Sequence, residues 1–446
     1  MAVKEGSLSA PERQPLDWQS ESFTDKDDLY AELERVYDIC HGCRRCVSLC
    51  DAFPTLFDLV DESDTLEVDG VDKDDYMKVV DQCFMCDLCA ETKCPYLPPH
   101  DWAVDFPHLM LRAKAYKFKQ GDTKWRDRII TSTDPIFDAL SLPGISQVAN
   151  AAAGASALRK LGDNMVGIHE AAPLPPFTHK PVSRAMPDEV GAGLQAKACE
   201  RTTGKVAIYT TCYGDHNEPQ VVEDLISVLN HNGVAVKILK DAKCCGMPKL
   251  ELGDLDKVAG LKDANLPLFL DAINDGYDII APIPSCVLMY KQELPLMFPG
   301  DSEIERVKQA FFDPFEYLDL RHKAGLVRTD FTQPLGKVAY HVACHQRVQA
   351  FGMKTRDFLS LIPDTEVTAI ERCSGHDGTY AIKSETYEKA MKIARPVVRR
   401  VKDAEADTFG SDCPMAGRFI AHGLDDESGG AAEHPISMVR RAYGIR

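Results

Sequence analysis

The 446-residue sequence contains no uninterrupted apolar run that approaches about 18 residues, the length that a membrane-spanning helix requires. Its first residues, MAVKEGSLSAPERQPLDWQSES, are polar and lack the apolar segment of a secretory signal. Nucleotide-binding and nucleophile motifs are also missing: no GxGxxG follows a strand pattern, and there is neither a Walker loop nor a GxSxG elbow. We therefore expect a cytoplasmic protein with no transmembrane segment and no flavin or nicotinamide site of its own.

Basic residues are fewer than acidic ones: the sequence has 51 Lys and Arg and 69 Asp and Glu, which gives a formal net charge of −18. Residues 21–81 hold much of this excess, with 18 acidic and 6 basic side chains. An acidic surface of this kind repels nucleic acid and anionic lipid, so we expect no nucleic-acid partner. The acidic region can steer a basic partner protein, or it can be a solvated face that keeps the protein soluble.

Cysteine is the residue in excess, with 16 in the chain. Disulfides are disfavoured in a reducing compartment, so this number of thiols indicates metal binding. Eight cysteines lie between positions 40 and 94, and seven more recur between 212 and 413. Cys199 stands alone, and we expect it to be a bystander.

The pattern of the chain divides it into a tail, a cysteine-dense helical region, a connector and a repeated α/β region. We predict a disordered tail over 1–28, a ferredoxin-type domain with two [4Fe–4S] clusters over 29–130, and a helical connector over 131–202. Two repeated α/β lobes follow over 203–330 and 331–446. The predicted fold class is therefore α plus α/β.

The connector has two apolar stretches, PIFDALSLPGI and ISQVANAAAGASALRKL. We expect these helices to pack on the protein's own core. The alternative is that they contact a partner subunit or lie peripherally on a membrane surface.

The first cysteine group repeats the spacing CxxCxxC twice, and each run is followed by a fourth cysteine after three or four residues. In two-cluster ferredoxins, the fourth cysteine of each run ligates the other cluster. Zinc is the alternative, but zinc usually takes two CxxC pairs rather than two such runs. We predict one [4Fe–4S] cluster on Cys40, Cys43, Cys46 and Cys94, and a second on Cys83, Cys86, Cys89 and Cys50.

The repeated region places cysteines at the carboxyl ends of predicted strands in both copies. The first copy opens with the strand KVAIYTTC and the second with KVAYHVAC. Parallel sheets bind ligands at this edge, so we infer two similar lobes that face each other across a shared cleft. The cysteines concerned are Cys212, Cys244, Cys245 and Cys286 in the first copy and Cys344, Cys373 and Cys413 in the second.

The segments CYGDHNEP, CCGMP, YHVACH and GTYAIKSETYEKAMKIA resemble the CCG-domain iron–sulfur oxidoreductase subunits. This group contains the C subunit of anaerobic glycerol-3-phosphate dehydrogenase, the D subunit of heterodisulfide reductase and the iron–sulfur subunit of glycolate oxidase. The resemblance covers about residues 30 to 446 and includes the tandem ferredoxin motifs. It implies an electron-transfer subunit that takes electrons from a flavoprotein dehydrogenase, or another redox protein, and passes them toward a quinone or another acceptor.

Two alternatives belong to other functional classes. In the heterodisulfide reductase relatives, complete CCG copies hold a non-cubane cluster that performs disulfide chemistry. An enzyme that reduces a disulfide or a small substrate at the CCG cleft is therefore the first alternative. A metal-dependent redox sensor or scaffold without turnover is the second.

The sequence departs from the complete CCG pattern at three positions. Met289 replaces the last cysteine of the first copy, and Ser374 and Ala416 replace two cysteines of the second. The four thiolates that remain in the first copy suffice for a third cluster. The alternative is that Cys244 and Cys245 are buried or redox-active thiols without metal.

The second copy retains only three cysteines, and histidines stand close to two of them. Imidazole can replace thiolate at an iron centre, so a metal ion or a modified cluster is one possibility. A degenerate lobe kept for packing and docking is the other. We expect His341, on the same strand, to be structural. The candidate ligands are Cys344, His345, Cys373, His376 and Cys413.

Overall fold

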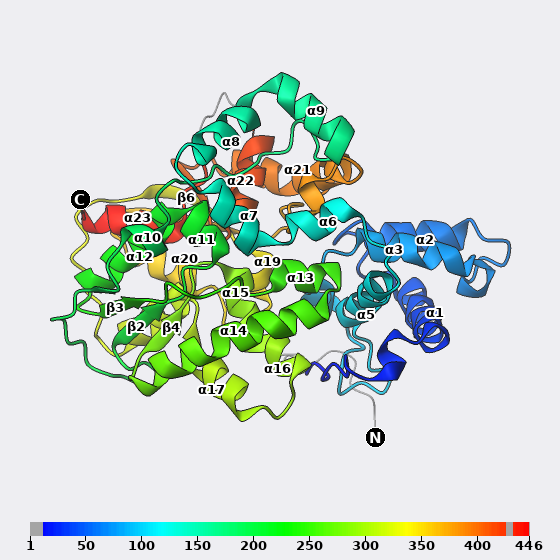
Figure 1. Ribbon diagram of the computed structural model, residues 1–446, viewed down its shortest axis with the longest axis horizontal. Coiled ribbons are helices and arrows are strands. Elements are labelled where there is room, and N and C mark those ends of the chain that lie inside the picture. The colour runs from blue at the N-terminus through cyan, green and yellow to red at the C-terminus, as the bar shows by residue number, and fades with distance from the viewer. Residues whose placement is uncertain (1–11, 425–430, 446) are drawn as a thin grey trace.

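The computed structural model describes residues 12–424 and 431–445 (Figure 1). The N-terminal helices lie on one side of the molecule, and the two small sheets with their helices lie on the other. The architecture is rich in helices and has small, mainly parallel sheets, as the α plus α/β prediction expects. Among the described residues, no helix is both long and apolar enough to cross a membrane.

The segment 12–25 packs along the junction between the N-terminal helices and the first lobe, whereas we predicted a disordered tail. Leu16 is buried, and Trp18 Nε1 donates a hydrogen bond to the carbonyl oxygen of Met297 at 3.0 Å. These partners are distant in sequence, so the polar composition of the segment does not reveal them. The first part of the predicted tail, 1–11, lies outside the described residues.

The cysteine-dense region is built from short helices, and no strand occurs in it among the described residues. Its core is aromatic: the phenol of Tyr37 donates to the carbonyl oxygen of Tyr76, and the rings of Phe53 and Phe106 lie 4.7 Å apart. The elements are η1 (Glu21–Thr24), α1 (Lys26–Cys43), α2 (Ala52–Asp61), η2 (Val68–Gly70), η3 (Lys73–Asp75), α3 (Tyr76–Gln82), α4 (Leu88–Lys93) and α5 (Phe106–Lys119).

The connector is helical as predicted, but only part of it packs on the core. Phe137 packs edge-on against His216 of the first lobe, whereas Val148, Leu158 and Met165 are exposed large apolar residues. The expectation that the connector helices pack on the protein's own core therefore does not account for the exposed apolar residues of α8 and α9, which lie at the top of Figure 1. The elements are α6 (Trp125–Ile130), α7 (Thr133–Leu140), α8 (Ile145–Gly154), α9 (Ser156–Val166), α10 (Val182–Ala185) and β1 (Glu189–Val190).

The first lobe is a five-stranded sheet in the order β1-β3-β2-β4-β5. β1 pairs antiparallel with β3, and the other neighbours pair in parallel, so the predicted parallel sheet is confirmed. The strands are β2 (Lys205–Ile208), β3 (Ala235–Ile238), β4 (Asp278–Ile280) and β5 (Phe311–Phe312). The helices are α11 (Cys212–His216), α12 (Pro219–His231), α13 (Met247–Leu252), α14 (Leu255–Asn274), α15 (Pro284–Leu288), the π-helical η4 (Met289–Glu293), α16 (Leu294–Met297), α17 (Ser302–Ala310) and α18 (Pro314–Lys323).

The second lobe repeats this plan on a smaller scale, with three parallel strands in the order β7-β6-β8. Helix α21 covers its sheet because small and branched residues recur every three or four positions along one face. Helix α23 lies on α12 of the first lobe, which joins the two lobes. The elements are β6 (Gly336–His341), α19 (Cys344–Arg347), α20 (Lys354–Leu359), β7 (Thr365–Ile370), η5 (Tyr380–Ile382), α21 (Tyr387–Asp403), β8 (Thr408–Ser411), α22 (Pro414–Gly423) and α23 (Pro435–Tyr443).

Candidate functional site

Fifteen of the sixteen cysteines gather in four groups, and none of the sixteen forms a disulfide. Cys199 is the exception: its Sγ lies 3.1 Å from the hydroxyl of Thr202 within a local turn, as expected for a bystander. We call the groups sites 1 to 4. Site 1 is Cys40, Cys43, Cys46 and Cys94, site 2 is Cys50, Cys83, Cys86 and Cys89, site 3 is Cys212, Cys244, Cys245 and Cys286, and site 4 is Cys344, Cys373 and Cys413.

Site 1 surrounds a small cavity that all four of its cysteines line, together with Tyr96 and Val104. The end of α1 supplies the first two cysteines, and the residue after α4 supplies Cys94. Burial raises the pKa of the Cys40 thiol, and the neighbouring Cys94, Cys46 and Cys43 raise it further. The chain thus brings Cys94 to the first motif, the arrangement that the predicted ligand exchange requires.

Site 2 forms where the loop between α3 and α4 folds back on Cys50. Met85 and Asp87 in this loop have positive φ angles of 55° and 60°, which turn the backbone around the thiols. Burial raises the pKa of Cys50, and the nearby Cys83 raises it further. The fourth cysteine of the first motif therefore lies with the second motif.

Site 2 lies within electrostatic range of site 1 and site 4. Burial raises the pKa of Cys89, and Cys46 of site 1 is the thiol that raises it most. Burial likewise raises the pKa of Cys86, with Cys344 and Cys373 of site 4 as the next contributors. Site 2 therefore lies between site 1 and site 4.

Site 3 lies at the carboxyl edge of the first sheet, as predicted. The Sγ atoms of Cys212 and Cys244 are 3.8 Å apart, and hydrogen bonds with Cys212 and Cys245 lower the pKa of Cys244. Gly246 has a φ of 95°, a left-handed conformation that suits glycine, and its N–H points at the Cys244 Sγ at 3.5 Å. Met289, which replaces the fifth cysteine, is fully buried.

A carboxylate that the sequence analysis did not single out also contacts site 3. The N–H of Cys244 donates to Asp134 Oδ1 at 2.9 Å. Burial and the adjacent Cys244 raise the pKa of Asp134 to about 6. Asp134 belongs to the connector, so only the folded chain brings it to the first lobe.

Site 4 contains three thiols at the carboxyl edge of the second sheet. Its two candidate histidines, His345 and His376, differ in their hydrogen bonding. His345 Nε2 donates to the carbonyl oxygen of Met85 at 3.2 Å, and its Nδ1 accepts from the hydroxyl of Ser285 at 2.8 Å. Both ring nitrogens of His345 therefore already make hydrogen bonds, and neither is left to bind a metal. We correct the prediction that His345 is a ligand: its role is structural.

His376 differs from His345 in its ring contacts. Its Nε2 is buried and has no hydrogen-bond partner among the described residues. Burial lowers the pKa of His376 to about 4, so the ring is neutral at pH 7. His341 bonds to Ser411 Oγ and to the carbonyl oxygen of Arg372, which agrees with its predicted structural role.

Charged side chains from three parts of the chain meet among sites 2, 3 and 4, and the sequence carried no signal for them. They are Lys114 of α5, Glu251 of α13, and Asp377 and Lys383 of the second lobe. Burial raises the pKa of Glu251 to about 7, and Lys114 and Lys383 oppose that shift. Each residue is unremarkable in its own segment, so only tertiary structure assembles the group.

The four sites fit iron–sulfur clusters chemically. Burial raises the pKa of most of these thiols, which means that burial disfavours the negatively charged thiolate. Several thiolates can therefore lie side by side only if a positive centre among them compensates their charge. Iron ions supply that charge, and the unpartnered His376 Nε2 is a further donor atom at the second lobe. Among the described residues, no three His, Cys, Asp or Glu side chains converge tightly enough for a single metal ion. Cubane ligands bind different irons and need no such convergence.

Comparison with known proteins identifies the repeated lobes. The family model of the cysteine-rich CCG domain matches residues 206–291 and 338–416. Each of the two lobes is therefore similar to a CCG domain. Both matches fall within the predicted lobes and include the cysteines of sites 3 and 4.

Three relatives agree with this assignment. The C subunit of anaerobic glycerol-3-phosphate dehydrogenase of Escherichia coli K12 is 27% identical over 344 residues, which cover 76% of this chain and 82% of the relative. An uncharacterized iron–sulfur protein of Methanocaldococcus jannaschii is 29% identical over 223 residues, 49% of this chain and 42% of the relative. Lactate utilization protein A 2 of Bacillus cereus 03BB102 is 28% identical over 212 residues, which cover 45% of this chain and 82% of the relative. The predicted resemblance is confirmed.

Proposed function

We propose that the protein is an iron–sulfur electron-transfer subunit that takes electrons from a flavin-linked dehydrogenase and passes them toward a quinone or another acceptor. The observation that carries the proposal is the adjacency of the sites. Burial raises the pKa of Cys89 of site 2, and Cys46 of site 1 raises it further. Burial also raises the pKa of Cys86 of site 2, and Cys344 and Cys373 of site 4 raise it further. Successive one-electron steps need redox centres that are close together and shielded from water.

A [4Fe–4S] cluster at each of sites 1 and 2, and another at site 3, would supply one-electron redox chemistry. The residues of the chain hold and tune these centres. The N–H groups of Gly246 and Gly375 point at the Sγ atoms of Cys244 and Cys373, at 3.5 and 3.3 Å. Such hydrogen bonds stabilise thiolate charge and favour reduction.

We further propose that site 4 holds a modified cluster, rather than a single metal ion, on its three thiolates and His376. The neutral, unpartnered Nε2 of His376 supports this ligand set. Ser374 and Ala416 occupy the remaining CCG positions, and both are buried.

The alternative of a disulfide-reducing enzyme is not favoured. Complete CCG copies have five cysteines, whereas Met289 leaves four in the first lobe and two replacements leave three in the second. By name, two of the relatives above are a dehydrogenase subunit and an iron–sulfur protein.

The E. coli relative is a dehydrogenase subunit by name, which supports a separate dehydrogenase as the partner. We place the protein in the cytoplasm. The exposed apolar residues of α8 and α9 are the candidate contact with the partner or, peripherally, with the inner face of the membrane.

Anaerobic purification with iron and acid-labile sulfide analysis tests the proposal. We expect about eight iron atoms from sites 1 and 2, and about twelve when site 3 is filled. Reduction should produce EPR signals of more than one cluster. Zinc in place of iron and sulfide would overturn the proposal.

A further inference from the structure

Lys114 is a cation placed against site 2. Its ammonium donates a hydrogen bond to the carbonyl oxygen of Cys83, the first cysteine of that site. Helix α5 packs closely against Gly253, the residue that follows α13. The contact is so close that a Cβ at Gly253 would collide with the backbone of Lys114. The backbone of Lys114 thus packs against the end of α13, while its ammonium contacts site 2.

The same ammonium acts on the site 2 thiols electrostatically. Burial raises the pKa of Cys83, and the charge of Lys114 is the largest opposing contribution. The ammonium, held at the Cys83 carbonyl, therefore stabilises negative charge at this cysteine.

Two carboxyl groups interact electrostatically with Lys114. The Glu251 carboxylate lies against Gly378, where a Cβ would collide with it, and the adjacent Asp377 interacts with both Glu251 and Lys114. Neutralisation of these carboxylates is the simplest role for Lys114. A second cation, Lys383, already faces the same two groups.

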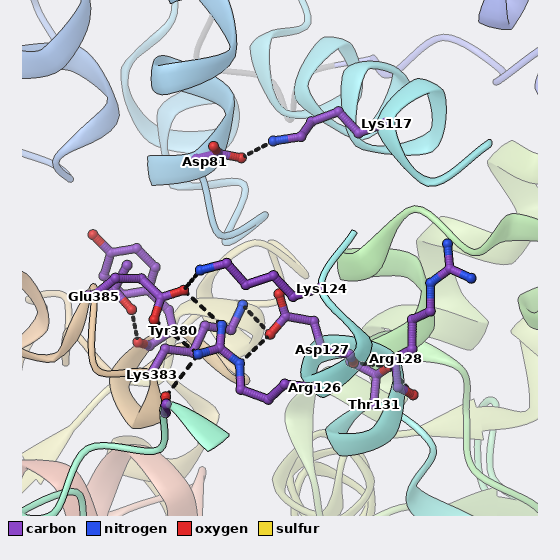
Figure 2. Close-up of polar contacts among 12 residues, drawn as sticks. Asp81, Lys117, Lys124, Arg126, Asp127, Arg128, Thr131, Tyr380, Lys383 and Glu385 are labelled. Atoms are coloured by element: carbon purple, nitrogen blue, oxygen red, sulfur yellow. Dashed lines mark hydrogen bonds and ion pairs between the residues drawn. The ribbon is translucent and has the colours of Figure 1, made fainter. Parts of the chain in front are cut away.

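Figure 2 shows that Lys383 also has a partner on its opposite side. Its ammonium lies 3.6 Å from Asp127 Oδ1, and Asp127 is bonded in turn to Arg126. Arg126 and Lys124 both bind Glu385. Lys383 therefore belongs to the network of ion pairs that joins α6 to the second lobe. Of the two lysines, Lys114 is the one that donates a hydrogen bond to a site 2 residue.

We propose that Lys114 is a positioning residue that raises the reduction potential of the cluster bound at site 2. One-electron reduction adds one negative charge to site 2, with no bond made or broken and no proton transferred. A nearby cation stabilises that added charge. Because site 2 lies between sites 1 and 4, the higher potential draws electrons from site 1 into the interior. The inference rests on the proposed function, since it requires a cluster at site 2.

The test is an EPR-monitored redox titration of the full-length protein carrying Lys114→Met, which removes the charge and keeps an unbranched side chain. Loss of one signal in Cys50→Ser assigns that signal to site 2. We expect the equilibrium constant for its reduction to fall at least tenfold, which is about 59 mV for a one-electron couple. The site 1 signal should move less.

Lys117→Met is the matched control, because Lys117 lies one turn further along α5 and its ammonium pairs with the Asp81 carboxylate at 2.6 Å (Figure 2). It should leave both potentials unchanged, and Lys114→Arg should retain most of the wild-type value. If Lys114→Met loads no cluster, Glu251→Gln provides the opposite test. At pH 8.5 it removes a carboxylate charge beside Lys114, and it should raise the site 2 potential.

The outcomes separate the two proposals. An unshifted site 2 potential in Lys114→Met with full iron content overturns the role of Lys114, and so does an equal shift in Lys117→Met. Lower stability without a shift shows that Lys114 only neutralises its carboxylate neighbours. A wild-type protein without EPR signals overturns the proposed function instead.

Discussion

His345 Nε2 donates a hydrogen bond to the carbonyl oxygen of Met85, a contact between residues 260 positions apart. A carbonyl only accepts, so Nε2 carries the proton and Nδ1 accepts from Ser285. The imidazole thus links the loop of site 2, the first lobe and the start of α19. This contact holds site 4 against site 2.

We therefore expect His345→Leu to destabilise the protein without removing iron. The variant leaves the buried carbonyl of Met85 and the hydroxyl of Ser285 unpaired, which costs about 1–3 kcal/mol. Urea unfolding followed by circular dichroism measures this loss. His179→Leu, at an exposed position, should change stability by less than about 0.5 kcal/mol. Loss of iron at unchanged stability would restore His345 as a ligand.

His376→Leu should have the opposite effect. Its Nε2 makes no hydrogen bond among the described residues, so an apolar replacement should cost little stability. The iron or metal content assigned to site 4 should fall, as measured by metal analysis and EPR. His341→Leu is the contrasting control, because its hydrogen bonds to Ser411 and Arg372 are lost while the metal content stays. Full metal content in His376→Leu contradicts the proposed ligand set.

The sequence predicted the cysteine sites far better than their surroundings. Regular cysteine spacing identified both ferredoxin-like motifs and the CCG copies, because each spacing is set within one short segment. His345 adjoins Cys344 and looked like a ligand, but its partners lie in two distant segments. Sequence pattern also missed Lys114 and Arg13, whose roles arise only where three parts of the chain meet.

Arg13 shows why the predicted tail differs from the structure. Its guanidinium is 4% exposed and binds Asp105 at 2.6 Å and Asp87 at 2.9 Å. A charged residue in a polar stretch usually indicates solvent exposure. Here two carboxylates from the cysteine-dense region compensate the buried charge, and neither is near Arg13 in sequence.

The same buried charges predict a pH dependence centred on His108. Burial lowers the pKa of His108 and Arg13 lowers it further, but Asp105 and Glu293 on its two ring nitrogens raise it to about 9 overall. The unfolded value is about 6.5. A raised pKa means that the folded state binds the proton more tightly, so the added stability is complete below about pH 6.5 and lost as the pH rises through 9.

We expect the unfolding free energy to fall by an amount on the order of 3 kcal/mol between pH 6.5 and pH 10. Urea titrations at several pH values measure the slope. His108→Gln removes the titrating group and should flatten this part of the profile. Equal slopes in the wild type and the variant would show that other groups control the dependence.

Site 3 gives the last prediction, because its four thiols separate a cluster from a set of metal-free thiols. Cys245 is buried beside Cys244 and Cys286, so Cys245→Ser removes one of four ligands while the side chain keeps nearly the same size. If site 3 holds a cubane, the iron content should fall by about four atoms per chain and one EPR signal should disappear.

Cys199→Ser is the matched control, because it makes the same chemical change at a cysteine that bonds only within its own turn. It should leave iron, sulfide and every EPR signal at wild-type values. Unchanged iron in both variants would mean that Cys244 and Cys245 are metal-free thiols. In that case the low pKa of Cys244, which hydrogen bonds from Cys212 and Cys245 produce, would mark it as the reactive thiolate of the first lobe.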